Sequence, residues 1–125
     1  MSAGRVSSKL ASKKNLGIQP KPWVRDPNWL ALPDITGQQK FVGLYAIFAE
    51  SNYIALSATT SAGTYTVDWG DGTSPVNIAS GTQANYLYDY ATVPGSPITH
   101  NGQSYKQVIV TVTPTTANLS IVNLN

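Results

Sequence analysis

The feature that most constrains the fold of this chain is a series of short β-patterned segments that begins at Lys40. Each segment is rich in aromatic and β-branched residues, and turn-forming residues separate it from the next. No segment has the apolar period of an amphipathic helix. Short strands at regular spacing predict an all-β, antiparallel β-sandwich. The segments are Lys40–Phe48, Asn52–Ala58, Tyr65–Trp69, Val76–Ala79, Ala84–Tyr90, Tyr105–Thr113 and Leu119–Leu124.

The sequence before these strands predicts an extended arm over residues 1–34. Residues 19–34 contain four prolines, each of which removes a backbone donor and drives the preceding residue into extended geometry. Trp23 and Trp29 are too apolar to stay in water, so each must pack on the body or on a neighbouring subunit. We expect the arm to make mostly intermolecular contacts. Its expected interface residues are Trp23, Arg25, Trp29 and Leu30.

Charge is scarce in this chain and unevenly distributed. Only 11% of the 125 residues are charged, and such a surface loses little solvation when a partner buries it. The first 25 residues carry six bases and no acid, whereas residues 26–125 carry two bases and six acids. A basic arm ahead of an acidic body suits docking on an acidic protein. Nucleic acid is not an expected partner, because six charges over 25 residues are too dilute for such a motif.

The string VDWGDGT, from Val67 to Thr73, is the most specific motif in the chain. Gly70 and Gly72 permit positive φ, and Asp71 can accept hydrogen bonds from a turn backbone. The string therefore predicts a tight corner after a strand, and Trp69 is expected beneath that corner in the core.

No group of residues in the sequence supports catalysis or a cofactor. The absence of cysteine excludes a thiolate metal site and a cysteine nucleophile. Asp68 and Asp71 are neighbours on one turn rather than acids across a cleft, and His100 lies in a predicted polar loop without a triad motif. Asp68, Asp71 and Asp89 would bind Ca²⁺ only if separate loops met, because they lack the spacing of a calcium loop. We expect no enzyme, no cofactor and no metal.

Three tyrosines, Tyr86, Tyr88 and Tyr90, recur at period two and are expected on one face of a strand. Two interpretations remain open. The tyrosines can pack in the core, which we favour, or they can form an aromatic surface that contacts glycan or protein.

These motifs resemble those of polycystic-kidney-disease-type (PKD) domains, which are immunoglobulin-like β-sandwiches. The matching parts are VDWGDG at 67–72, Tyr88 and the strand at 105–114. The resemblance implies a PKD-like sandwich over residues 35–114. The long insert at 91–104 departs from the family, which has a tight turn there.

A wider pattern over residues 29–114 resembles tailed-bacteriophage virion proteins of the tail, neck or fibre; it includes WLALP, QKFVGL, SNYIAL and VDWGDG. This resemblance implies a structural subunit located in the virion, which docks on other virion proteins through its arm. Residues 115–125 are expected to form a terminal strand, Leu119–Leu124, that pairs with another chain or begins a further region. A homo-oligomer, as a ring or a trimer, would satisfy such edges.

The alternative function is a carbohydrate- or host-surface-binding module, in which the three tyrosines would contact a glycan. A secreted module is expected to begin with a signal peptide or a flexible linker, whereas this chain begins with a basic arm. The longest apolar run, Phe41–Ala49, is well short of the roughly 20 residues needed to span a bilayer. We therefore expect no membrane partner.

Overall fold

The computed structural model describes residues 22–116 and 118–124. This part of the chain forms strands joined by turns and one short 3₁₀ turn, η1. It contains no helix that could cross a membrane. The elements are β1 (Phe41–Phe48), β2 (Tyr53–Thr60), β3 (Thr64–Asp68), β4 (Val76–Ala79), β5 (Gln83–Leu87), η1 (Tyr90–Thr92), β6 (Ile98–His100), β7 (Gln103–Pro114) and β8 (Leu119–Leu124).

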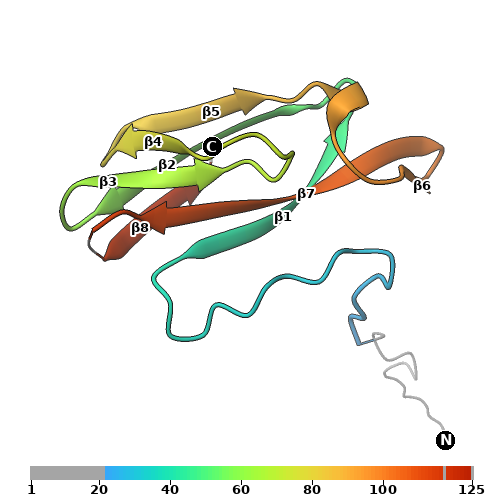
Figure 1. Cartoon of the computed structure of the whole chain (residues 1–125). Helices are drawn as coiled ribbons and strands as arrows, with labels where there is room; N and C mark the ends of the chain where they lie inside the picture. Colours follow the sequence, from blue (N-terminus) through green and yellow to red (C-terminus); the bar gives the residue numbers. More distant parts are fainter. Residues whose placement is uncertain (1–21, 117, 125) are drawn as a thin grey trace, which may run out of the picture.

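The strands form two antiparallel sheets packed face to face (Figure 1). The larger sheet has the order β1-β7-β3-β4, and β6 pairs with the first residues of β7. The smaller sheet has the order β5-β2-β8. All strand pairs among the described residues are antiparallel. This arrangement confirms the predicted all-β sandwich.

Alternation along the strands selects the side chains that fill the space between the sheets. Successive residues of a strand point to opposite faces, so every second side chain enters the core. Burial of one such aliphatic side chain stabilises the fold by about 1.5–3 kcal/mol. The fully enclosed part of this core therefore holds the sandwich together. Its largest members are Ile47, Leu56, Tyr65, Val67, Tyr88, Val108, Val110 and Val112.

The larger sheet is also apolar on the side that faces away from the core, along β1 and β7. The β7 valines at 108, 110 and 112 point inward, so the alternate residues of β7 point outward together with their cross-strand partners in β1. We call this surface the outer face; it consists of Leu44, Ala46, Phe48, Tyr105, Gln107 and Ile109. An apolar face of this kind requires a cover. Figure 1 shows the segment before β1 running along this side of the sheet.

The last strand pairs within the chain, which corrects the expectation that it pairs with another one. β8 forms an antiparallel ladder with β2, from Leu56 opposite Leu124 to Thr60 opposite Leu119. Leu119 and Val122 pack against the core. β8 therefore completes the smaller sheet, and only its outer edge has no strand partner among the described residues.

The insert at 91–104 also differs from its predicted loop. Its second half is a hairpin in which β6 pairs with the start of β7. Asn101 and Gly102 form the turn with φ of 51° and 78°, the left-handed geometry that a two-residue hairpin turn needs. His100 consequently ends a strand and is exposed.

Candidate docking surface

The four arm residues expected to form an interface lie together in one cluster, which we call the arm cluster: Trp23, Arg25, Trp29 and Leu30. The two indole ring centroids are 6.2 Å apart, and the rings are tilted by 41°. The guanidinium carbon of Arg25 lies 5.7 Å from the centroid of the Trp29 ring, within cation–π range. The same guanidinium donates a hydrogen bond to the carbonyl of Leu30. The cluster thus combines two large aromatic rings with one cation.

A proline turn brings the cluster together. The backbone N–H of Trp29 donates to the carbonyl of Asp26 at 3.0 Å, which closes a turn with Pro27 at its second position. Proline favours this position because its ring fixes φ near the value that the turn requires. The Asp26 carboxylate also accepts from the N–H of Asn28 at 2.8 Å. The turn reverses the chain, so that Arg25 faces Leu30.

Gln107, on the outer face, anchors the arm to the body. Its Oε1 accepts from the N–H of Leu30 at 2.8 Å, and its Nε2 donates to the carbonyl of Asn28 at 2.8 Å. One side-chain amide therefore binds the arm backbone at both of its polar atoms. The indole N–H of Trp29 donates to the hydroxyl of Tyr105 at 3.3 Å. All three bonds are formed within the chain, and they hold residues 28–30 on its own larger sheet.

We expected the arm to make mostly intermolecular contacts; the described residues 22–34 also contact their own sheet, and the intermolecular contacts stay a prediction. Their anchoring contacts are intramolecular, because the outer face supplies acceptors and donors at the right spacing. The part of the prediction that falls on residues 1–21 lies outside the described residues.

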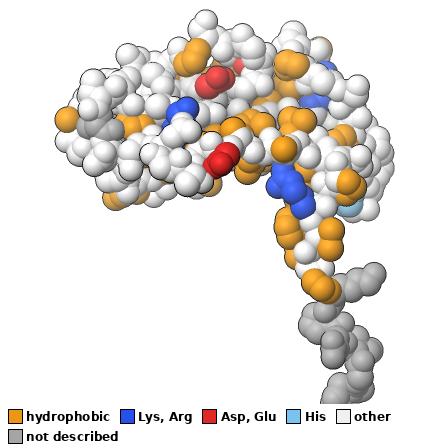
Figure 2. Space-filling view, turned by 60° about the horizontal axis from the view of Figure 1, so that its bottom comes forward, with side chains coloured by type: hydrophobic (Ala, Val, Ile, Leu, Met, Phe, Trp, Pro, Cys, Tyr) orange, Lys and Arg blue, Asp and Glu red, His pale blue; other side chains and the backbone are white. Residues whose placement is uncertain are grey.

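The side of the arm cluster that points away from the sheet is open to solvent. Trp23 is 74% exposed and Leu30 is 46% exposed. Val24 and Leu32, beside them in the sequence, are exposed as well. Figure 2 shows hydrophobic and basic side chains gathered where the described chain leaves the body. The arm is therefore seated on one side and uncovered on the other.

The corner at 69–72 has the predicted structure. Gly70 and Gly72 have φ of 78° and 91°, and Trp69 is only 2% exposed. The Asp68 carboxylate accepts from the N–H of Gly70 at 2.9 Å. Asp71 accepts from the backbone N–H and the hydroxyl of Thr73. The aspartates therefore satisfy the backbone of the corner.

The tyrosines secure this corner rather than forming one surface. Tyr86 stacks on Trp69 with 5.3 Å between ring centroids, and its hydroxyl donates to Asp71 at 2.6 Å. The hydroxyl of Tyr88 donates to the Trp69 carbonyl at 2.7 Å, and Tyr88 is only 1% exposed, which removes it as a surface contact. β5 ends at Leu87, since Asp89 caps η1 through the N–H of Ala91.

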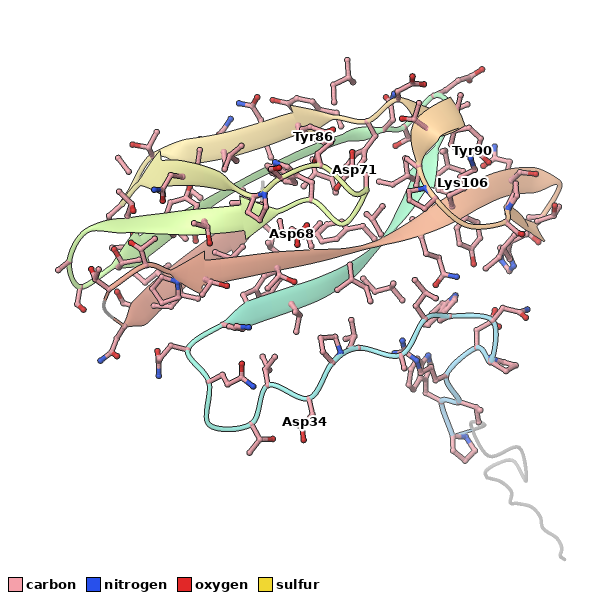
Figure 3. All side chains as sticks on the ribbon, in the orientation of Figure 1. Asp34, Asp68, Asp71, Tyr86, Tyr90 and Lys106 are labelled. Atoms are coloured by element: carbon pink, nitrogen blue, oxygen red, sulfur yellow. The ribbon has the colours of Figure 1, made fainter. Side chains whose placement is uncertain are left out.

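Tyr90 consequently lies outside β5. It lies in η1, where the Lys106 ammonium is 4.9 Å from its ring centroid and donates to its carbonyl at 3.0 Å. Figure 3 shows Asp71 and Tyr86 near each other, with Tyr90 and Lys106 toward another end of the sandwich. Tyr88 nevertheless lies in the core, and Tyr86 and Tyr90 pack against it, which confirms the favoured interpretation. Only the expectation that all three belong to one strand is wrong, because β5 ends at Leu87.

The aspartates of the body belong to two turns: Asp68 and Asp71 to the corner, and Asp89 to the start of η1. Among residues 22–116 and 118–124, no three acids or histidines lie close enough to hold a metal ion. Burial raises the pKa of Asp71, but the hydrogen bonds from Thr73 and Tyr86 lower it by a larger amount. The pKa of Asp71 therefore lies below its ordinary value. The bond to this carboxylate raises the pKa of the Tyr86 hydroxyl. Asp71 is thus a structural carboxylate held in its charged form.

The anchor residue Gln107 was not among the predicted site residues. Its signal in the sequence is an amide between Tyr105 and Ile109, on what is otherwise an apolar face of a strand. An uncharged polar residue at such a position needs a hydrogen-bond partner. The sequence alone does not show that the partner is the arm backbone.

Comparisons of the chain with protein-family models, with curated proteins and with solved structures find no match. The fold and the contacts described above are therefore the basis for a function.

Proposed function

We propose that the chain is a structural subunit of a phage particle and that it docks on neighbouring virion proteins, copies of itself included, through the arm cluster. The observation that supports this proposal is the exposure of two tryptophans and an arginine on a surface that the body leaves uncovered. The resemblance of residues 29–114 to virion proteins favours a phage particle as the assembly.

The uncovered side of the arm cluster carries a free-energy cost that a partner would remove. Trp23 is 74% exposed. Because a tryptophan can bury on the order of 200 Å² at about 25 cal/mol per Å², covering the exposed three quarters of it would contribute roughly 3–4 kcal/mol. Tryptophan and arginine are also the residue types most enriched at the energetic centres of protein interfaces. The composition of the cluster is therefore that of a docking surface.

The rest of the surface suits permanent burial. Only 11% of the residues are charged, and the described residues contain no ion pair that binding would have to break. Thr, Ser and Asn side chains cost less to desolvate than charged groups. A subunit of a lasting assembly benefits from such a surface, because little solvation is lost when its neighbours cover it.

Sedimentation velocity of the full chain at several concentrations tests the docking. We expect the wild type to self-associate and Trp23→Ser to weaken that association by on the order of 100-fold, the factor that corresponds to about 3 kcal/mol. Val76→Ser is the matched control, because Val76 is an exposed apolar residue on β4, outside the arm. A wild type that stays monomeric at every concentration would contradict self-docking.

A second measurement tests the phage setting. Particles purified from the natural source should contain the chain at a fixed copy number, measured by quantitative mass spectrometry. A chain that remains in the particle-free fraction contradicts the proposal.

The glycan-binding alternative has less support. Tyr88 is buried and Tyr86 is engaged with Trp69 and Asp71, so the three tyrosines do not form a platform for a sugar ring. A glycan array with the wild-type chain tests it directly: micromolar binding by a monomer would favour this alternative.

A further inference from the structure

We propose that the arm exchanges between copies of the chain. Residues 22–30 of one chain would then lie on the outer face of a second chain and make there the same contacts that they make within their own chain. This inference rests on the proposed function, because it names the surface that receives the arm. The partner is a second copy of this chain, and its receiving residues are those that anchor the arm here: Gln107 and Tyr105.

The receiving surface is already shown to fit this segment. Gln107 makes two hydrogen bonds of 2.8 Å to the arm backbone, and Tyr105 accepts one from Trp29. Apolar residues of β1, including Leu44 and Ala46, line the space beside Trp29. An exchanged arm would make identical contacts, so exchange changes little interaction energy. This is the general reason why domain swapping is a low-cost route to an oligomer.

The connector between the arm and β1, residues 31–40, can redirect the arm with the loss of at most one side-chain bond to the sandwich, which the N–H of Leu119 donates to Gln39 at 3.3 Å. All of its residues except Ile35 are exposed. Its turn is closed locally, by bonds from the N–H and the hydroxyl of Thr36 to Asp34. Gly37 has a φ of 77°, and no neighbouring atom lies within 4 Å of the position that a Cβ would take. A hinge consists of a few loop residues, often small ones such as glycine, that can change their φ and ψ angles.

The connector is also long enough to reach a neighbour. Ten extended residues span about 33 Å. A domain of about 100 residues has a radius of gyration of about 13 Å. The extended connector is therefore about as long as the diameter of roughly 34 Å that this radius implies for a sphere, and the arm can lie on an adjacent copy.

A reciprocal exchange would cover the side of the arm cluster that stays exposed to solvent when the arm lies on its own chain. The arm cluster is seated by three hydrogen bonds, yet Trp23 is 74% exposed. In a two-fold exchanged pair both arms lie between the two bodies, so the second body covers the side that now faces water.

Cross-linking tests the exchange cleanly, because the chain has no cysteine of its own. Asn28→Cys and Ala46→Cys are made as separate full-length variants. Both positions are exposed and lie against Gln107, which binds the carbonyl of Asn28 and is the cross-strand partner of Ala46. Neither side chain supplies a bond to the anchor. The two variants are unfolded together, refolded as a mixture and treated with a short bis-maleimide.

We expect covalent dimers that join position 28 of one chain to position 46 of another, identified by peptide mass spectrometry. Each variant refolded alone is the control and should give few dimers. Asn28→Cys mixed with Val76→Cys, an exposed position on β4 outside the outer face, measures random collision and should also give few dimers. A yield at position 76 equal to that at position 46 would reflect random collision and would count against the exchange.

The remaining outcomes separate this inference from the proposed function. The double variant Asn28→Cys/Ala46→Cys shows whether the arm stays in its own chain. If it cross-links only internally, and the mixture gives no dimers while sedimentation still shows an oligomer, the exchange is wrong and docking through the arm stands. If the wild type is monomeric at every concentration, the exchange and the docking on copies of itself both fail, and docking on other virion proteins then depends on finding the chain in purified particles.

Discussion

The corner at 69–72 and the arm are built from the same kinds of residue, yet they end in opposite states. Each has a tryptophan beside an aspartate-capped turn. In the corner, Trp69 is 2% exposed, with Tyr86 stacked on its ring and Tyr88 bonded to its carbonyl. In the arm, Trp29 beside the Asp26 turn is 37% exposed, and Trp23, which contacts it, is 74% exposed. The difference shows that the corner is complete within one chain, whereas the arm still has a surface to offer a partner.

The largest expected effect comes from crowding the corner. A Cβ at Gly70 would collide with the carbonyl oxygen of Ile109 and lie 2.9 Å from its nitrogen, on top of the strain of a φ of 78°. We expect Gly70→Val to destabilise the sandwich by about 4 kcal/mol, the sum of left-handed strain and overpacking. Urea denaturation followed by tryptophan fluorescence measures this loss.

Gly72→Val is the matched control for that prediction. Gly72 has a φ of 91°, but no atom lies within 4 Å of the Cβ position. Only the backbone strain remains, so we expect a loss of about 1–2 kcal/mol. Equal losses at the two glycines would show that the close approach of β7 does not lock the corner.

The next effect is the loss of one buried hydrogen bond. Tyr88→Phe removes the donor to the Trp69 carbonyl and leaves that acceptor unpaired in the core. We expect a destabilisation of about 1–3 kcal/mol. Tyr90→Phe is the control, since the Tyr90 hydroxyl is buried with no hydrogen-bond partner among the described residues. Thermal melting of the two variants should rank them in this order, and the reverse ranking would contradict the assignment.

A smaller effect appears in the pH dependence of stability. The pKa of Asp71 is lower in the folded chain than in the unfolded one. Its stabilisation is therefore present above the unfolded pKa of about 4 and is lost as the pH falls through the folded pKa. Urea midpoints measured at decreasing pH should decline in the wild type and decline less in Asp71→Asn.

Asp34, in the connector, allows the same pH measurement outside the sandwich. Hydrogen bonds from Thr36 lower its pKa as well, but it lies in the exposed connector. Asp34→Asn should therefore leave the pH profile of the sandwich unchanged. A profile that flattens equally in both variants would mean that the connector unfolds together with the body.

The sequence predicted the parts of the fold that depend on local rules. Alternation of apolar residues placed the strands, and the corner followed from Gly70, Gly72 and Trp69. The Asn101-Gly102 turn carries an equally local signal, since this dipeptide favours a two-residue hairpin. The prolines and glycines of the surrounding insert obscure this signal, because they favour an irregular loop.

The rest depends on contacts between residues far apart in the sequence. Gln107 is 77 residues from Leu30, whose N–H it binds, and no period relates them. β8 looked unpaired because its partner β2 lies across the turn-rich middle of the chain. Tyr90 continued the period of Tyr86 and Tyr88 in the sequence, but the Asp89 cap ended the strand before it. The candidate site was therefore predictable as a set of arm residues, but its anchor was not.

The smallest expected effect on stability is at the anchor, where the arm is the part that responds. Gln107→Ala removes both bonds to the arm backbone, but Gln107 lies on the outer face and not in the core. We expect the unfolding free energy of the sandwich to change by less than about 1 kcal/mol, as is usual for substitutions outside the core. The arm should detach more often, so trypsin should cleave after Arg25 about fivefold faster, the factor set by one lost hydrogen bond. Thr111→Ala, also on β7 but without a bond to the arm, is the control. Equal cleavage rates in both variants would show that Gln107 does not hold the arm, and the contrast between a self-contained corner and a weakly seated arm would then need another cause.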